Sequence, residues 1–207
     1  MSGNVTLRDD LRSSIKIRFR PGLRLSDEAF WRLCRANPNL RLERSAAGEL
    51  IIVSPSGADS DRRNLGIAAQ LWNWNQANGL PGVAFGPSAG FTLPNTAVRG
   101  PDAAWISRDR WESLSEDDRA RFTHICPEFV VEVRSPSDRK GELRAKMREY
   151  LANGARLGWL IDPTIKARTV EIYRPDLSVE VLKRPDTLSG EDVLLGFVLD
   201  LRGILFD

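Results

Sequence analysis

The sequence predicts a single domain of the α/β or α+β class, in which helices flank a mixed β-sheet. The first observation is that helices and strands are expected to alternate along the chain, in the order helix, strands, helix, strand, strands. The second is residues 155–163 (ARLGWLIDP), which are apolar enough for a strand buried on both faces, as inside a mixed sheet. The third is size: 207 residues, 42% hydrophobic and 28% charged, suffice for one soluble domain with a sizeable core.

The N-terminal part is expected to contain a helix and a hairpin. Ser26 can cap a helix over residues 27–37, whose acidic first turn suits a helix N-terminus. Residues 40–53 (LRLERSAAGELIIV) indicate two strands, with Gly48 in the turn and Glu49 opening the second strand.

Residues 54–64 are polar and are expected to form a loop before a helix over residues 65–79. Helical periodicity places four residues on one face of that helix, which we expect to be buried: Leu65, Ala68, Leu71 and Trp72. Two strands follow at 82–86 and 90–94, and residues 95–100 form a loop that leads to a strand beginning at Asp102.

The second half predicts further helices and strands. Residues 108–122 indicate one or two short surface helices, and residues 128–134 (EFVVEVR) indicate a central strand. A helix over 138–154 is expected to be capped by Ser137 or Asp138. After the strand at 155–163 come a hairpin and a tail that packs back on the core, at 169–186 and 193–206.

Composition excludes several classes of protein. No apolar run is long enough to span a bilayer, and the polar N-terminus lacks the apolar segment of a signal peptide, so a cytoplasmic location is expected. The net charge of +2 does not by itself indicate a nucleic-acid-binding protein. The two cysteines have no metal-ligand spacing.

Three charged side chains are candidates for one site. Glu132 lies inside an apolar strand, where a carboxylate is costly unless it is paired or bound to a cation. Asp102 follows a Gly-Pro turn at the start of another strand. Lys146 lies on the flank of the buried stripe of the 138–154 helix, and Arg139 lies on the same flank two turns earlier. Both basic side chains can lean toward the sheet.

Two carboxylates on adjacent strands beside a lysine suit metal-dependent phosphodiester hydrolysis. Mg²⁺ prefers oxygen ligands and keeps several waters, and a nearby lysine can stabilise developing negative charge. Each residue also has an ordinary structural explanation. Asp102 can be a turn residue, Glu132 can pair with Arg134 on its own strand face, and Lys146 can be a surface lysine.

These residues occur in stretches that resemble the Uma-type restriction endonuclease family, long carried as a domain of unknown function, within the PD-(D/E)xK nuclease superfamily. The resemblance spans residues 20–205, and its most specific stretches are GELIIVSPSG, RGPDAAWIS, CPEFVVEVRSPSD and KMREYLANGARLGWLIDP. It implies a restriction-endonuclease-like core at about 56–165. The N-terminal helix and hairpin (15–55) and the C-terminal hairpin and tail (166–207) would be extensions of that core.

The resemblance also implies roles for the site residues. Asp102 and Glu132 would be metal ligands for Mg²⁺, with Mn²⁺ as a possible substitute. The superfamily pattern expects lysine at position 134, where this chain has Arg134, so Lys146 would supply the catalytic lysine. Arginine stays charged and cannot act as a base, but it can bind phosphate.

Further residues are expected around these. Arg134 and Arg139 are expected to contact the substrate, and the resemblance implies that Glu49 completes the metal site. Asn64 matches a recurring position with no assigned role, and related sequences often have histidine where this chain has the segment 59–61.

The function expected from the sequence is therefore a metal-dependent DNA endonuclease. A homodimer is expected from the geometry of double-strand cleavage and from family analogy. Two alternatives stay open: a nucleic-acid-binding or regulatory protein that keeps the fold without cutting, and a glycosidase that uses Glu132 and Asp102 without a metal.

Overall fold

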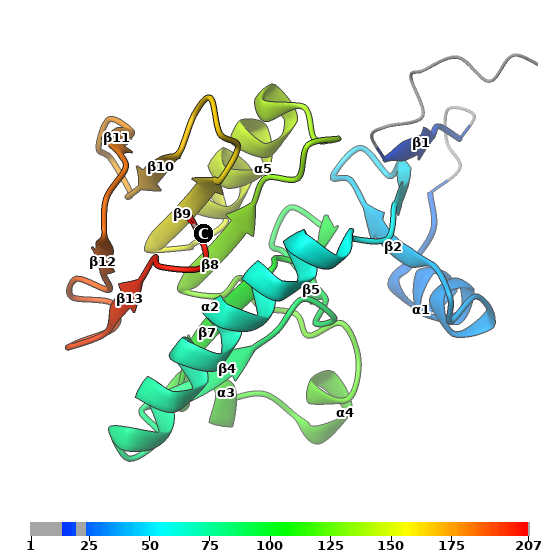
Figure 1. Ribbon diagram of the computed structural model, residues 1–207. Coiled ribbons are helices and arrows are strands. Elements are labelled where there is room, and N and C mark those ends of the chain that lie inside the picture. Colours follow the sequence, from blue (N-terminus) through cyan, green and yellow to red (C-terminus); the bar gives the residue numbers. More distant parts are fainter. Residues whose placement is uncertain (1–13, 20–23, 207) are drawn as a thin grey trace, which may run out of the picture.

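The structure is a computed structural model that describes residues 14–19 and 24–206. It confirms a single domain of mixed α/β architecture, in which helices flank the sheets (Figure 1). The expected limits of the core, near residues 56 and 165, stay a prediction.

The larger sheet, within the described ranges, has six strands in the order β11-β10-β9-β8-β7-β4. Its strands are β4 (Gly82–Phe85), β7 (Ala103–Ser107), β8 (Phe129–Val133), β9 (Leu157–Asp162), β10 (Thr169–Tyr173) and β11 (Glu180–Lys183). β8 and β9 are parallel and the other neighbours are antiparallel, so the expected mixed sheet with a central β8 is confirmed.

A second sheet in the described part of the chain has five short strands in the order β1-β3-β2-β6-β5. They are β1 (Ile15–Ile17), β2 (Arg41–Arg44), β3 (Leu50–Val53), β5 (Phe91–Thr92) and β6 (Val98–Arg99). The β2–β3 hairpin turns at Gly48, whose positive φ of 83° favours glycine. The loop expected at 95–100 instead contains β6, because Val98 pairs with Arg44 of β2 and with Thr92 of β5.

Helix α1 (Asp27–Ala36) packs beside this second sheet, and the cap at Ser26 is confirmed because its side chain accepts from the N–H of Ala29 at 3.1 Å. Phe30 of α1 is fully buried with Leu50 and Val98. Figure 1 shows α1, β1 and β2 together at the side of the molecule away from β10 and β11.

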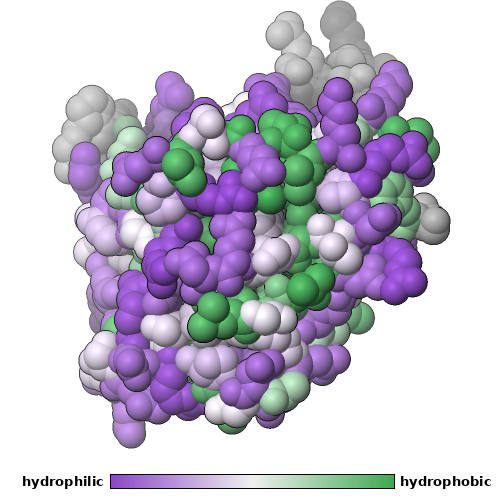
Figure 2. Space-filling view, turned by 90° about the vertical axis from the view of Figure 1, so that its left-hand side faces the viewer, coloured by the Kyte–Doolittle hydropathy of each residue, from purple (hydrophilic) through white to green (hydrophobic). Residues whose placement is uncertain are grey.

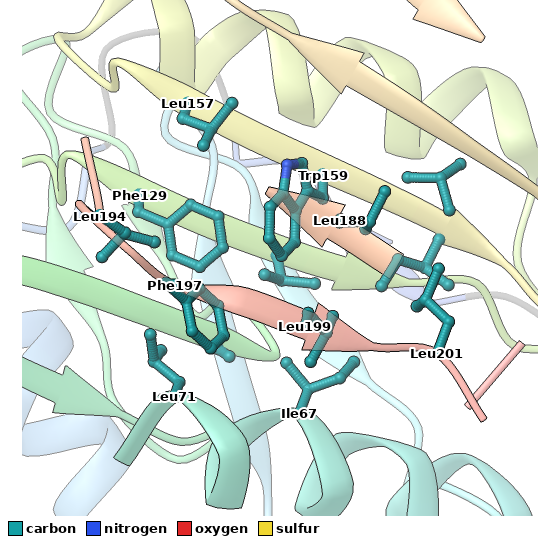
Figure 3. Packing of buried hydrophobic residues seen from close by; sticks show 14 of the residues in the cluster. Ile67, Leu71, Phe129, Leu157, Trp159, Leu188, Leu194, Phe197, Leu199 and Leu201 are labelled. Atoms are coloured by element: carbon teal, nitrogen blue, oxygen red, sulfur yellow. The ribbon is translucent and has the colours of Figure 1, made fainter. Parts of the chain in front are cut away.

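Opposite faces of the larger sheet are covered by different elements. Helix α2 (Ala58–Ala77) and the C-terminal tail pack on one face, and helix α5 (Lys140–Ala152) packs on the other. Figure 3 shows Ile67 and Leu71 of α2 against Phe129, Trp159 and the tail. The tail includes the small sheet of β12 (Thr187–Ser189) and β13 (Val198–Asp200). Its expected packing on the core is confirmed.

The face predicted for α2 was only partly right. The helix begins at Ala58, so it takes in more than half of the expected loop, and Leu65 and Trp72 are 68% and 51% exposed. Leu71 is buried as expected, and Asn64, Ile67 and Asn75 are buried beside it. Asparagine is tolerated there because its amide is bonded: Asn75 donates to Gly82 O and accepts from the indole of Trp105.

Helix α5 approaches the sheet closely above Gly158, where a Cβ would lie 2.5 Å from Cε of Met147. The predicted cap was wrong. The residue before the first turn is Arg139, with no side-chain cap, because Asp138 accepts from the N–H of Ser135 instead. The two expected surface helices are α3 (Arg108–Glu112) and α4 (Glu116–Arg119).

The surface is largely polar on the side viewed in Figure 2, where hydrophilic residues predominate and hydrophobic ones form smaller areas between them. Scattered exposed hydrophobic residues are ordinary for folded proteins. Among the helices in the described ranges, none combines the length and apolar character needed to cross a membrane.

Candidate active site

Asp102 lies immediately before β7, with its side chain fixed by two hydrogen bonds. Its Oδ2 accepts from the backbone N–H of Val133 at 2.8 Å, and its Oδ1 accepts from Nδ2 of Asn64 at 3.1 Å. The backbone N–H of Asp102 also donates to Val131 O. The carboxylate is therefore held at the neighbouring strand β8, the strand that carries Glu132.

Glu132 points to the α5 side of the sheet, because residues alternate along β8 and Val131 and Val133 pack on the α2 side. Its Oε1 lies 2.8 Å from Nζ of Lys146 and accepts from the hydroxyl of Tyr150 at 3.1 Å. Lys146 and Tyr150 are one helical turn apart on α5, so both reach the same carboxylate.

The second sheet contributes Glu43, from β2. Its Oε1 accepts from Lys146 Nζ at 2.9 Å and from the N–H of Gly100 at 3.1 Å, and its Oε2 lies 3.1 Å from Nη1 of Arg99. Lys146 also donates to Gly100 O at 3.2 Å. The lysine thus bridges carboxylates from both sheets. We call Asp102, Glu132, Lys146 and Glu43 the junction cluster.

Electrostatics distinguish the three carboxylates of the junction cluster. Burial raises the pKa of Glu132 to about 7, with further repulsion from Asp102 and Glu43 and partial relief from Lys146. Burial likewise raises the pKa of Asp102. Glu43 is buried too, but Lys146 and Arg99 outweigh its desolvation and hold its pKa at about 2. Burial therefore disfavours the ionised forms of Asp102 and Glu132 more than the nearby cations favour them.

The residues present fit a hard divalent cation held largely by water. Within the described residues, no three acidic, histidine or cysteine side chains gather as a closed metal site. Mg²⁺, however, is commonly bound through one or two carboxylates with several waters retained. Asn64 supplies a further observation, because its buried Oδ1 has no hydrogen-bond partner among the described residues. Because Nδ2 of Asn64 donates to Oδ1 of Asp102, the amide oxygen of Asn64 points away from that carboxylate oxygen.

Arg134 lies outside the junction cluster. Although it follows Glu132 by two residues, its Nη1 pairs with Asp162 at 3.0 Å. Lys140 of α5 contacts the same carboxylate oxygen at 3.2 Å. Arg139, at the start of α5, is exposed. The two basic residues expected at the site thus lie just after β8 (Arg134) and just before the first turn of α5 (Arg139).

Glu49 also lies outside the junction cluster. Its side chain pairs with Arg18 at 2.6 Å and lies beside the hydroxyl of Ser45, at the hairpin turn. The acidic residue of this hairpin that contacts Lys146 is Glu43. Sequence reasoning missed Glu43, although it carries the same signal as Glu132: an acidic residue in the interior of a strand rather than beside a turn glycine.

Arg41 is a second residue that the sequence did not single out. Its Nη1 lies 3.8 Å from Oδ1 of Asp102, and its Nη2 donates to Gly100 O at 2.7 Å. About a third of the side chain is exposed (32%). Arg41 is two residues before Glu43, so both project from the same face of β2.

Comparisons with known proteins agree with this architecture. A family model described as "Uma2: Putative restriction endonuclease" matches residues 27–202. The fold is similar to the crystal structure of "a putative nuclease belonging to DUF820" from Anabaena variabilis ATCC 29413, with a TM-score of 0.64. The two sequences are 20% identical, and the match covers 79% of this chain and 89% of the other, so it shows the fold alone. No curated protein matches the chain.

Proposed function

The chain belongs to the Uma2 family, and we propose that it is a metal-dependent endonuclease that hydrolyses phosphodiester bonds of DNA. The observation that carries the proposal is the buried pair of Asp102 and Glu132, whose pKa values are raised by burial, and for Glu132 also by repulsion from Asp102. A structural ion pair normally lowers the pKa of its carboxylate. Carboxylates whose pKa values stay raised although a lysine lies beside them are typical of a functional site.

The proposed metal-holding residues are Asp102 and Glu132, with Nδ2 of Asn64 hydrogen-bonded to Asp102. A bound Mg²⁺ would polarise the phosphoryl oxygen and lower the pKa of a water ligand. Asn64 and the N–H of Val133 orient Asp102 toward β8 through their hydrogen bonds.

Lys146 is the proposed catalytic cation. Its Nζ is held by Glu132, Glu43 and Gly100 O, so its position is set before substrate binds. Preorganised donors of this kind stabilise charge that develops in the transition state. Glu43, with its low pKa, stays ionised and anchors Lys146, and we assign it the supporting role that sequence reasoning gave to Glu49.

Cleavage assays test this proposal. Supercoiled plasmid, single-stranded circular DNA and RNA should each be incubated with Mg²⁺, with Mn²⁺ and with a chelator. We expect DNA cleavage that requires the metal and is lost in Asp102→Asn and Glu132→Gln. Asp109→Asn, at an exposed aspartate of α3, is the matched control and should cut at the wild-type rate.

The nucleic-acid-binding alternative and a metal-independent reaction have distinct results in these assays. Absence of cutting on every substrate, with DNA binding retained, would support a nucleic-acid-binding protein that keeps the fold. Equal cutting in chelator would contradict the metal requirement. The homodimer also belongs to the proposal. It would place two sites on opposite strands, and light scattering of the DNA complex should give the mass of two chains plus that of the DNA.

A further inference from the structure

A cavity of about 140 Å³ adjoins the junction cluster and is not used in the reaction proposed above. Its lining comes from β2, β6, the residues around 87–90 and Phe122. One water needs only about a tenth of this volume, so the cavity has room for a larger group. We call it the side cavity.

The walls of the side cavity differ in chemistry. Leu42, Val98 and Phe122 provide apolar and aromatic surface, and Ser88 lies at an exposed position of the lining. Phe122 is fixed by Phe30 and Trp31, whose ring centroids lie 5.6 and 5.1 Å from its own. A rigid aromatic wall opposite polar backbone suits a flat ring with hydrogen-bonding edges.

The polar wall leads directly to the junction cluster. Arg41, Glu43, Arg99 and Gly100 all line the side cavity. The charge of Glu43 is balanced by Lys146 and Arg99, so this carboxylate does not make the cavity repel an anion. Arg41 spans the two sites, since its guanidinium lies 3.8 Å from Asp102 and bonds Gly100 O. A planar guanidinium at such a junction is well suited to bind phosphate.

We propose that the side cavity binds the base of one unstacked nucleotide of the substrate strand, while Arg41 binds the phosphate next to that nucleotide. This inference rests on the proposed function, because it takes DNA as the substrate. A nucleotide combines the two groups that the lining accommodates: a planar ring for the wall at Phe122 and an anion for Arg41. The occupant is thus part of the strand whose phosphodiester lies at Asp102 and Glu132.

Occupation of the side cavity has a consequence for substrate choice. A base must leave its stack to enter, and in intact duplex this also breaks a base pair. Stacking on one aromatic ring only partly offsets that cost. Single-stranded, mismatched or frayed DNA is therefore bound better than intact duplex.

Binding measured in chelator tests the inference without any cleavage. A single-stranded oligonucleotide with one 2-aminopurine reports base environment by fluorescence and affinity by anisotropy. Ser88→Trp should block the cavity and weaken single-strand binding at least tenfold. Ser178→Trp, at an exposed serine of the β10–β11 turn, is the matched control and should bind like wild type. Intact duplex should bind more weakly than the single strand.

Two further measurements keep the inference independent of one variant. Phe122→Leu, measured at a temperature at which the variant is fully folded, should reduce single-strand affinity and the 2-aminopurine signal. An abasic site in place of 2-aminopurine should weaken wild-type binding and remove the difference between wild type and Ser88→Trp. Wild-type affinity in both variants, no loss with the abasic strand, or no binding of single strands would overturn the inference.

The same experiments separate this inference from the proposed function. Binding that depends on the side cavity, without cutting in Mn²⁺, would contradict the nuclease proposal and support the nucleotide site. Cutting with no effect of Ser88→Trp or of the abasic strand would keep the nuclease proposal and remove the nucleotide site.

Discussion

Two groups of buried charges lie on the α5 side of the molecule and behave differently. One is the junction cluster of Asp102, Glu132, Lys146 and Glu43. The other, which we call the strand-end cluster, consists of Asp162 and Glu171 with their cations Arg134, Lys140 and Arg144. The side chains of Asp162 and Glu171 are only 1% and 3% exposed, so both clusters bury carboxylates.

The carboxylates of the strand-end cluster are fully compensated. Burial opposes their ionisation, but Thr164 and Arg134 lower the pKa of Asp162, and Arg144 and Tyr173 lower the pKa of Glu171. Arg144 contacts both oxygens of Glu171, with its Nη2 at 2.6 Å. In the junction cluster, Lys146 is shared by two carboxylates, and the pKa of Glu132 stays raised.

The difference teaches that burial of a carboxylate does not by itself indicate a catalytic site. The strand-end cluster is satisfied within the chain, so its expected contribution is to stability. In the junction cluster the pKa of Glu132 stays raised, and the amide oxygen of Asn64 is unbonded among the described residues, so its expected contribution is to binding and catalysis.

The largest expected effect separates two lysines of α5. Lys146→Met should lower the rate of DNA cleavage by about 10²-fold or more, the scale for losing one preorganised electrostatic group. Lys140→Met, in the strand-end cluster, should stay within about threefold, since Asp162 and Glu171 keep their arginines. Equal losses in both variants would erase the distinction between the clusters.

Glu171→Gln should destabilise the fold by about 1–2 kcal/mol at pH 7, because it breaks a buried pair whose cation Arg144 is partly solvated. The lowered pKa of folded Glu171 sets the direction in which stability changes with pH. Ionised Glu171 stabilises above its unfolded pKa of about 4.3, and this stability is lost as pH falls through the folded pKa. Urea denaturation should therefore show the difference from wild type shrinking below about pH 4. A constant difference would contradict this account.

Glu132→Gln should have the opposite effect in chelator: it should raise the free energy of unfolding by about 1–2 kcal/mol at pH 8. The pKa is raised from 4.5 to about 7, so the stability contributed by protonated Glu132 is present at acidic pH and lost as pH rises between these values. The neutral amide avoids that loss, while Lys146 keeps Glu43 and Gly100 O. Melting curves from pH 4 to 8 test this. A variant less stable than the wild type at pH 8 would contradict the prediction and show that Glu132 behaves like the carboxylates of the strand-end cluster.

The smallest expected effect concerns the two acids of the β2–β3 hairpin. Glu49→Gln should change stability by less than about 0.5 kcal/mol, because its partner Arg18 is 83% exposed. Cleavage should be nearly unchanged. Glu43→Gln should reduce cleavage clearly, since it removes an anchor of Lys146. The reverse ranking in one cleavage assay would return the supporting role to Glu49.

The parts of the site that the sequence predicted depend on local periodicity. Alternation along β8 and the turn of α5 are enough to bring Glu132 and Lys146 to one side of the sheet, 2.8 Å apart. Pro101 and Asp102 mark the start of the adjacent strand. These relations depend on periodicity within single elements and on elements that follow one another along the chain, which sequence patterns describe well.

The parts that the sequence missed depend on packing between elements. Arg41 and Glu43 reach the site only because the second sheet docks beside the first, and no periodicity encodes that approach. The buried face of α2 was misjudged because Asn64 and Asn75 are polar, and their burial makes sense only with partners distant in sequence, Asp102 and Trp105.

Titration with Mn²⁺, followed by electron paramagnetic resonance of the free ion, tests the central claim most directly. The wild type should bind the ion, and Asp102→Asn and Glu132→Gln should each weaken binding at least tenfold. Asp162→Asn and Glu171→Gln, from the strand-end cluster, should bind as the wild type does. Wild-type affinity in both junction variants, or loss of binding in the strand-end variants, would contradict the assignment of Asp102 and Glu132 as the metal-holding pair.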